Sequence, residues 1–166
     1  MIEYKKIPIE DKNQLKTLID TVYNSLERKE FFMPFTEEEI DDIFDENKVI
    51  NMGAYDEEKL VGTAQLYLEE TCVKKIKQEI KLQSNKVIEL GGYLVLEKYR
   101  NQGIMKMLET ILIEKAKKLD YEFIVITVHP ENIFSNKATE FTGARLVKTA
   151  HLGEYLRNVY VLDLKK

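Results

Sequence analysis

Residues 86–130 contain a strand, a long helix and a second strand in direct succession, and this order constrains the fold more than any other feature. The first strand, "KVIELGGYLVLE", carries paired glycines, which indicate a bulge or a close approach by another backbone or a ligand. The second, "FIVITVHP", is a continuous apolar run typical of a buried central strand. Between them, apolar residues recur at helical spacing after Gly103. Such a crossover requires the two strands to run parallel within one sheet.

Shorter patterns on both sides of this crossover predict hairpins and further helices. We expect strands over residues 2–7, 49–56, 60–69, 144–152 and 155–164, and helices after Asp11, over 36–46, over 71–83 and over 133–141. Asp11 is placed to cap the first helix, and Thr36 with Glu39 forms a capping box for the second, an acidic helix. The chain is therefore predicted to be a mixed α/β protein with a central, mostly antiparallel sheet, one parallel strand pair and flanking helices. No repeat or linker interrupts the 166 residues, so we expect one domain over 1–166.

The composition argues against several classes of protein. A formal net charge of -4 argues against a nucleic-acid binder, which needs a basic face to neutralise phosphates. No apolar run approaches the length of a membrane span, so no membrane partner is expected. The lone Cys72 cannot form a disulfide within the chain, which favours a reducing, cytoplasmic location. His129 and His151 are far apart and lack zinc spacing, so no metal site is expected.

The loop "YRNQG", which opens the long helix, has the chemistry of an anion site. Backbone N–H groups at a helix N-terminus have no partner within the helix and carry partial positive charge, so they can bind phosphate. Gly103 would let an anion approach the backbone closely, and Arg100 would add a charge-assisted contact. Taken alone, this arginine and glycine fit an ordinary strand-to-helix turn equally well.

The segment "LVLEKYRNQGIMKML" resembles the acetyl-coenzyme A motif of the GCN5-related N-acetyltransferase (GNAT) superfamily. The matching residues are Val95, Tyr99, Arg100 and Gly103, followed after the next strand by Asn132, Ser135 and Gly143. The order of elements also resembles the GNAT fold. The resemblance covers nearly the whole chain and implies an acyltransferase that uses acetyl-coenzyme A, with a sheet whose parallel strand pair is splayed.

The resemblance also implies which residues bind the cofactor. Backbone amides of the loop would surround the pyrophosphate, while Leu94 and Val95 would lie beside the pantetheine arm as in β-augmentation. Asn132, with Ser135 in the same element, would contact the arm. The expected loop residues are Arg100, Asn101, Gln102, Gly103, Ile104 and Met105, with Lys106 adding charge near phosphate. Met105 stands where the family pattern has a second small residue, so we expect its side chain to point into the core while its N–H faces phosphate.

The implied reaction transfers an acetyl group from a thioester to a primary amine by direct attack in a ternary complex. An amine must lose a proton to attack, so a carboxylate or an ordered water is needed as the base. We nominate Glu89, six residues before Val95 on the strand beside the cofactor. Glu89 could instead be a solvent-facing charge on the sheet, and Glu69 and Glu70 are rivals for the role.

The residue that would protonate the leaving sulfur departs from the family pattern. The usual helix tyrosine, seven residues after the asparagine, is Thr139 here. Ser135, Tyr155 and Tyr93 are candidate replacements, or no acid is needed. His129 ends the buried strand beside the expected thioester, where it is either catalytic or an ordinary loop histidine.

The acceptor side is expected in the segment "RKEFFMPFTEEEIDD", between the first two helices. The resemblance implies a pocket wall here, although some of its apolar residues could belong to the core. The candidate lining residues are Phe31, Phe32, Met33 and Phe35, with Glu89 and His129 also facing the acceptor. We expect a small-molecule amine as the acceptor; a protein or peptide N-acetyltransferase and a non-catalytic acyl-CoA-binding regulator are alternatives. The habit of the family suggests a homodimer.

Overall fold

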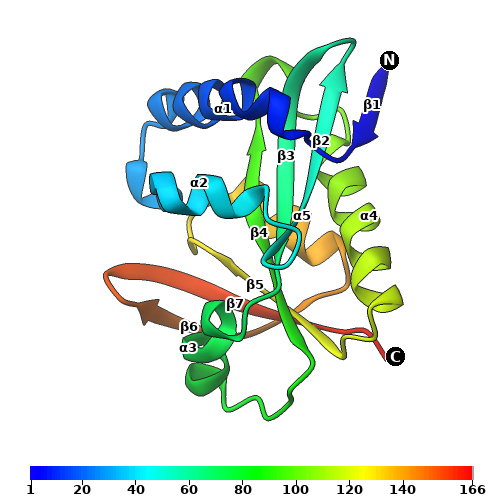
Figure 1. The fold of residues 1–166 in the computed structure, drawn as a ribbon. Helices are drawn as coiled ribbons and strands as arrows, with labels where there is room; N and C mark the ends of the chain where they lie inside the picture. The colour runs from blue at the N-terminus through cyan, green and yellow to red at the C-terminus, as the bar shows by residue number, and fades with distance from the viewer. Residues whose placement is uncertain (166) are drawn as a thin grey trace.

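The computed structural model describes residues 1–165 and contains one seven-stranded mixed sheet (Figure 1). Its strands are β1 (Ile2–Lys5), β2 (Val49–Asp56), β3 (Lys59–Tyr67), β4 (Val87–Val95), β5 (Phe123–Val128), β6 (Arg145–Leu152) and β7 (Tyr155–Asp163). They lie in the order β1-β2-β3-β4-β5-β7-β6, and only the β4–β5 pair is parallel. The predicted crossover and both predicted hairpins are therefore confirmed.

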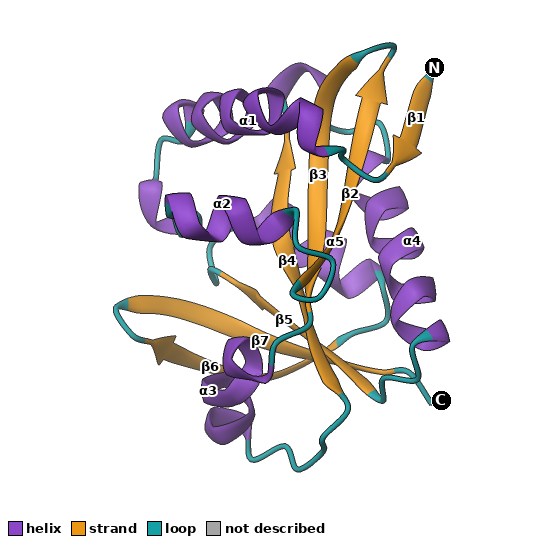
Figure 2. Ribbon diagram, in the orientation of Figure 1, coloured by secondary structure: helices purple, strands orange, loops and turns teal. Residues whose placement is uncertain are grey.

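Helices cover both faces of this sheet (Figure 2). They are α1 (Lys12–Ser25), α2 (Glu37–Ile43), α3 (Glu70–Ile80), α4 (Ile104–Lys118) and α5 (Ile133–Phe141). The apolar stripe of α4 is buried against β2, β3, β4 and β5 in the largest hydrophobic cluster. On the opposite face, α1 and α2 bury a second cluster and α3 a third. The sheet therefore separates the α4 side of the protein from the α1–α2 side, and β4 contributes buried residues to both.

Two details of the first helices differ from the sequence prediction. The capping box is present, because Thr36 Oγ1 accepts from the N–H of Glu39 and the Glu39 carboxylate accepts from the N–H of Thr36. However, α2 ends at Ile43, before the expected Glu46. The Asp45 carboxylate accepts from the N–H of Asn47, a local turn that competes with the helix. Asp11 occupies the N-cap position of α1, but its side chain accepts from Tyr55 Oη at 2.7 Å instead of capping the helix.

The middle of β4 contains the bulge that its paired glycines predict. The register against β3 shifts between Thr63 and Gln65, and Gly92 has a left-handed φ of 65°. A Cβ on Gly92 would lie 1.8 Å from Gln65 Oε1, so no other residue fits there without displacing this buried side chain. Parallel pairing with β5 stops just before the bulge, at Glu89 and Val125. Beyond that point the two strands diverge (Figure 1), which confirms the splayed pair. We call the unpaired interval between β4 and β5 the slot.

Candidate active site

The loop between β4 and α4 presents a row of free backbone amides. Gly103 is the N-cap of α4, is exposed and has a left-handed φ of 78° with no side-chain cap. Within the described chain, the first helical hydrogen bond runs from the N–H of Met107 to Gly103 O, and the amides from Asn101 to Lys106 have no acceptor. Several converging N–H groups at a helix N-terminus form an anion site. The loop therefore has the geometry that a pyrophosphate cradle requires.

The side chains of this loop leave its amides uncovered. Arg100 Nε donates to Val95 O at 3.2 Å, which folds the guanidinium back along the end of β4. Gln102 Nε2 donates to Lys98 O at 3.2 Å. Met105 is half-buried and packs against the α4 core cluster, and Ile104 is buried. Lys106 Nζ lies 4.4 Å from the centroid of the Phe141 ring on α5, at the outer side of the loop.

Asn132 caps the start of α5, and Thr139 in the same helix is no proton donor to the reaction. Asn132 Oδ1 accepts from the N–H of Ser135 at 3.2 Å, so this side chain caps the helix. Thr139 is fully buried, and its hydroxyl donates to Ser135 O at 2.9 Å. Thr139 therefore serves the helix and does not face the slot between β4 and β5 as a proton donor.

Glu89 lies at the point where β4 and β5 separate. It is half-buried, opposite Tyr67 of β3 and Val125 of β5. No hydrogen bond or ion pair of the described residues reaches its carboxyl, and burial raises its pKa to about 8. The Glu89 carboxylate also contributes to raising the pKa of the nearby Cys72 thiol, which burial shifts to about 11. A carboxyl with a pKa near neutrality at the end of a slot is suited to act as a general base.

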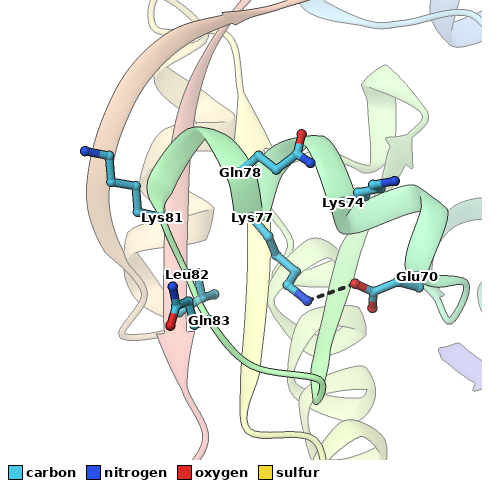
Figure 3. A pocket seen from close by; sticks show the side chains of 7 residues that line it. All are labelled: Glu70, Lys74, Lys77, Gln78, Lys81, Leu82 and Gln83. Carbon is cyan, nitrogen blue, oxygen red and sulfur yellow. Dashed lines mark hydrogen bonds and ion pairs between the residues drawn. The ribbon is translucent and has the colours of Figure 1, made fainter.

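The rival carboxylates are exposed, unlike Glu89. Glu70, at the start of α3, forms an ion pair of 2.8 Å with Lys77 on the rim of a shallow, lysine-rich hollow outside the sheet (Figure 3). Glu69 is exposed just after β3. Tyr155 begins β7 half-buried, with the Arg157 guanidinium carbon 5.1 Å from its ring centroid, and no hydrogen bond within residues 1–165 joins it to Glu89 or Ser135.

Where the acceptor is expected to bind, the loop between α1 and α2 contacts the loop between β5 and α5. The Phe31 ring lies 4.9 Å from the His129 ring, centroid to centroid, and Arg28 stacks on Phe31 at 4.8 Å. Arg28 also pairs with Glu131 at 2.8 Å. His129 is buried and its Nδ1 accepts from the N–H of Glu131, while burial and nearby arginines lower its pKa. These effects favour the neutral imidazole, which packs against Phe31 where the two loops meet.

The other two phenylalanines behave as core residues. Phe32 and Phe35 are half-buried, with ring centroids 5.5 Å apart, and both pack against the cluster beneath α1 and α2. Met33 is exposed. Phe32 and Phe35 therefore pack against the core, whereas Phe31 packs against His129 of the neighbouring loop.

The family model described as "Acetyltransferase (GNAT) family" matches residues 19–141, which include β4, the loop at Gly103, β5 and all of α5. The chain belongs to the GNAT acetyltransferase family. The expected enzyme class, an acyltransferase, is thereby confirmed. A comparison with curated proteins finds no significant match. No helix of the described residues is both long enough and apolar enough to cross a membrane.

Solved structures confirm the GNAT fold. An N-acetyltransferase from Staphylococcus aureus Mu50 is 24% identical, with a TM-score of 0.75 over 100% of this chain and 99% of that one. Arabidopsis thaliana NAA60 in complex with acetyl-CoA is 16% identical, with a TM-score of 0.80 and 100% of both chains covered. The ribosomal-protein-S18-alanine N-acetyltransferase from Escherichia coli is 14% identical, with a TM-score of 0.72 over 99% and 94%. At these identities the likeness establishes the fold alone.

Sequence reasoning missed one acidic residue of this GNAT domain. Glu109 lies on α4 directly after the buried Leu108 and is itself fully buried. Its Oε2 accepts from Tyr93 Oη at 3.2 Å, and its Oε1 has no partner among the residues described. Burial raises the pKa of Glu109 to about 8, against the opposing effects of the Tyr93 hydrogen bond and Lys106. In the sequence, the one sign that Glu109 is buried is its position next to the apolar stripe of α4.

Glu109 should make the stability of this GNAT domain depend on pH. Because the folded pKa of about 8 exceeds the ordinary 4.5, the folded state holds a proton that the unfolded state releases, and stability falls as pH rises from about 4.5 to about 8. The variant Glu109→Gln has no ionisable group at this position, so its stability should not fall with pH for this reason. We expect it to raise the free energy of unfolding above pH 8 by about 2–5 kcal/mol, and to change it little near pH 4.5.

Urea unfolding at both ends of this pH range measures the effect. Glu114→Gln is the matched control, because Glu114 is an exposed carboxylate on the same helix, paired only with Lys117 at 3.3 Å. It should change stability by less than about 1 kcal/mol. An equal effect of Glu109→Gln at low and high pH would show that Glu109 is ionised in the folded state.

Proposed function

We propose that this chain is an N-acetyltransferase that transfers the acetyl group of acetyl-coenzyme A to a small primary amine, by direct attack in a ternary complex. The observation that carries the proposal is the position of Glu89. This base candidate ends the paired part of β4, and the same strand leads directly into the loop of free amides at Gly103. The acyl donor and the base are thus held by one continuous stretch of chain.

The residues present fit acetyl-coenzyme A. The amides from Asn101 to Lys106 would bind its pyrophosphate, since they have no acceptor within the described chain. The arm would lie along the part of β4 beyond Glu89 that β5 leaves unpaired, including Leu94 and Val95. Asn132 and Ser135 at the start of α5 would line the far side. When bound, the cofactor supplies an activated acetyl group as a thioester.

Glu89 prepares the amine for attack. An ammonium group is not nucleophilic, and an ionised Glu89 takes its proton. Because burial holds the pKa of Glu89 at about 8, the fraction of ionised base increases as pH rises through that value. The half-buried Tyr67, opposite Glu89 on β3, forms the adjoining part of the site.

The acceptor side favours a small molecule. The Phe31–His129 contact and the Arg28–Glu131 ion pair join the two loops that border this side. Joined loops close the end of the site, whereas a protein or peptide acceptor needs an open groove across the sheet. The similar Escherichia coli enzyme carries the name of a protein acetyltransferase, which makes peptide acceptors a necessary arm of any test.

An amine panel with acetyl-coenzyme A, followed by release of free thiol, tests the proposal. We expect turnover with at least one small primary amine and none with peptides of varied N-terminus or with lysine-containing peptides. Turnover with peptides alone would favour the protein acetyltransferase. Thermal stabilisation by acetyl-coenzyme A without thiol release on any amine or peptide would favour a non-catalytic acyl-CoA-binding regulator.

A further inference from the structure

Tyr93 and Glu109 form a hydrogen-bonded pair that connects the slot with the buried side of α4. Tyr93 Oη and Glu109 Oε2 are 3.2 Å apart, and Glu109 is fully buried with its Oε1 unpartnered within residues 1–165. A buried, unpartnered carboxylate oxygen is costly, and a neutral carboxyl group costs far less. The surroundings therefore favour a Glu109 that keeps its proton.

Tyr93 brings this pair to the slot. It lies in the bulge of β4, beyond the last residue that pairs with β5, and is only half-buried. The charged or titratable groups around the pair are few. Lys106 on α4 faces Glu109, while Glu109 and the Glu89 carboxylate both raise the already high pKa of Tyr93. Tyr93 thus lies within electrostatic reach of the carboxyl on either side of it.

The protonation state of Glu109 determines the direction of its hydrogen bond with Tyr93. An ionised Glu109 can only accept, so the Tyr93 hydroxyl proton is held in their mutual hydrogen bond. A neutral Glu109 can donate to Tyr93 Oη instead, which leaves the Tyr93 proton free for another acceptor. Thr139 cannot supply a proton here, because its hydroxyl is bound to Ser135 O on α5.

We propose that Tyr93 and Glu109 act as a proton-donating pair, in which neutral Glu109 donates to Tyr93 and Tyr93 protonates the sulfur that leaves in the acetyl transfer. The proposal rests on the proposed N-acetyltransferase function. Tyr93 is then the catalytic acid, and Glu109 is a positioning residue and proton store behind it. Neither residue belongs to the motif by which the family is recognised in this sequence.

The proton transfers balance. When the carbon–sulfur bond of the thioester breaks, its electron pair stays on sulfur, and Tyr93 Oη gives the sulfur a proton. Tyr93 takes a proton from Glu109, which becomes a carboxylate and regains a proton from water before the next turnover. The acceptor ammonium loses two protons as it becomes an amide. Glu89 takes the first and returns it to water before the attack, and it takes the second as the amide forms and again returns it to water. In the transfer step one proton is gained at Glu89 and one is lost at Glu109, so each turnover releases one proton to water and no further reactant is needed.

The first test is infrared spectroscopy of the ligand-free protein. A difference spectrum between wild type and Glu109→Gln should show the C=O stretch of a protonated carboxyl at neutral pH, disappearing as pH rises through about 8. This measurement needs neither acetyl-coenzyme A nor an acceptor. A carboxylate signal from Glu109 at neutral pH would overturn the proposal.

The second test is the pH profile of kcat with an amine that the wild type acetylates. Tyr93→Phe should lower kcat by about 100-fold, while isothermal titration finds acetyl-coenzyme A binding within about threefold of wild type. Glu109→Gln keeps a hydrogen-bond donor to Tyr93 but has no proton to pass on, so it should lower kcat at neutral pH, though less than Tyr93→Phe does, and it should lose the fall of kcat that wild type shows above about pH 8. A structural role alone would not abolish this fall.

Tyr121→Phe is the matched control, because Tyr121 is another half-buried tyrosine packed against the α4 core cluster, in the turn before β5. It should leave kcat and its pH profile unchanged. Wild-type kcat in Tyr93→Phe would refute the pair while the proposed function stands. A wild-type protein that acetylates nothing would refute the function itself, whatever the infrared result.

Discussion

Replacing Gly103 by aspartate should abolish the binding of acetyl-coenzyme A. A Cβ at this position meets no atom within 4 Å, so the new side chain does not clash and projects from the N-cap among the free amides. There its carboxylate would occupy the amides that are proposed to bind the pyrophosphate, and its charge would repel that group. We expect at least a 100-fold increase in Kd by isothermal titration, or about 3 kcal/mol.

Two controls separate charge from backbone strain. Gly103→Asn introduces a side chain of the same shape without the charge, and asparagine tolerates the left-handed conformation as aspartate does. Its Kd should increase by much less than that of the aspartate variant. Gly153→Asp places the same carboxylate at another left-handed glycine with open surroundings, in the turn between β6 and β7. Equal losses in Gly103→Asn and Gly103→Asp would mean that backbone conformation, and not anion binding, explains the effect.

Replacing Glu89 by glutamine should remove the base and leave the cofactor site intact. We expect kcat to fall by about 100-fold to 1,000-fold, with the Kd of acetyl-coenzyme A unchanged. The wild-type rate should rise with pH up to about 8, because a base with this pKa works only when ionised; above that pH the loss of the Glu109 proton lowers the rate again. Steady-state kinetics across pH, with an acceptor amine that is already neutral at lower pH, would show this rise in wild type and its absence in Glu89→Gln.

Glu69→Gln serves as the comparison for this variant. Glu69 is exposed just after β3 and is one of the two carboxylates that compete with Glu89 for the role of base. It should keep at least half of the wild-type kcat. The base assignment fails if Glu69→Gln loses activity and Glu89→Gln does not, although the cradle at Gly103 would be unaffected by that result.

Most of the fold could be predicted because local patterns specify it. The residue ranges of β2 and α5 were predicted as they occur, since hydrophobic alternation and the turn residues around them are local signals. The bulge followed from the glycine pair, but its cause, the Gln65 side chain on the neighbouring strand, did not. The predicted side-chain cap of Asp11 was wrong for a similar reason: its hydrogen-bond partner Tyr55 lies 44 positions away in the sequence, where no local pattern reports it.

The candidate site divides in the same way. The cradle belongs to one continuous segment, so the residues from Arg100 to Lys106 could be found by inspection. The Phe31–His129 wall joins loops that are far apart in the chain, and no local pattern reports such a contact. Glu109 was missed because an acidic residue within a helix is ordinarily assigned to the solvent side, whereas here α4 turns it towards Tyr93.

Because β4 and β5 stop pairing early, few hydrogen bonds join the two parts of the sheet. Only Val87, Ile88 and Glu89 pair with β5, so β1–β4 and β5–β7 are two half-sheets that share a short seam. Beyond it, backbone groups that would complete a continuous sheet face the slot instead. In the proposed complex, the pantetheine arm of acetyl-coenzyme A would lie there and would supply the missing partners, as in β-augmentation. Release of coenzyme A would leave these backbone groups unpaired again, so the hydrogen bonding between the two half-sheets would change in every turnover.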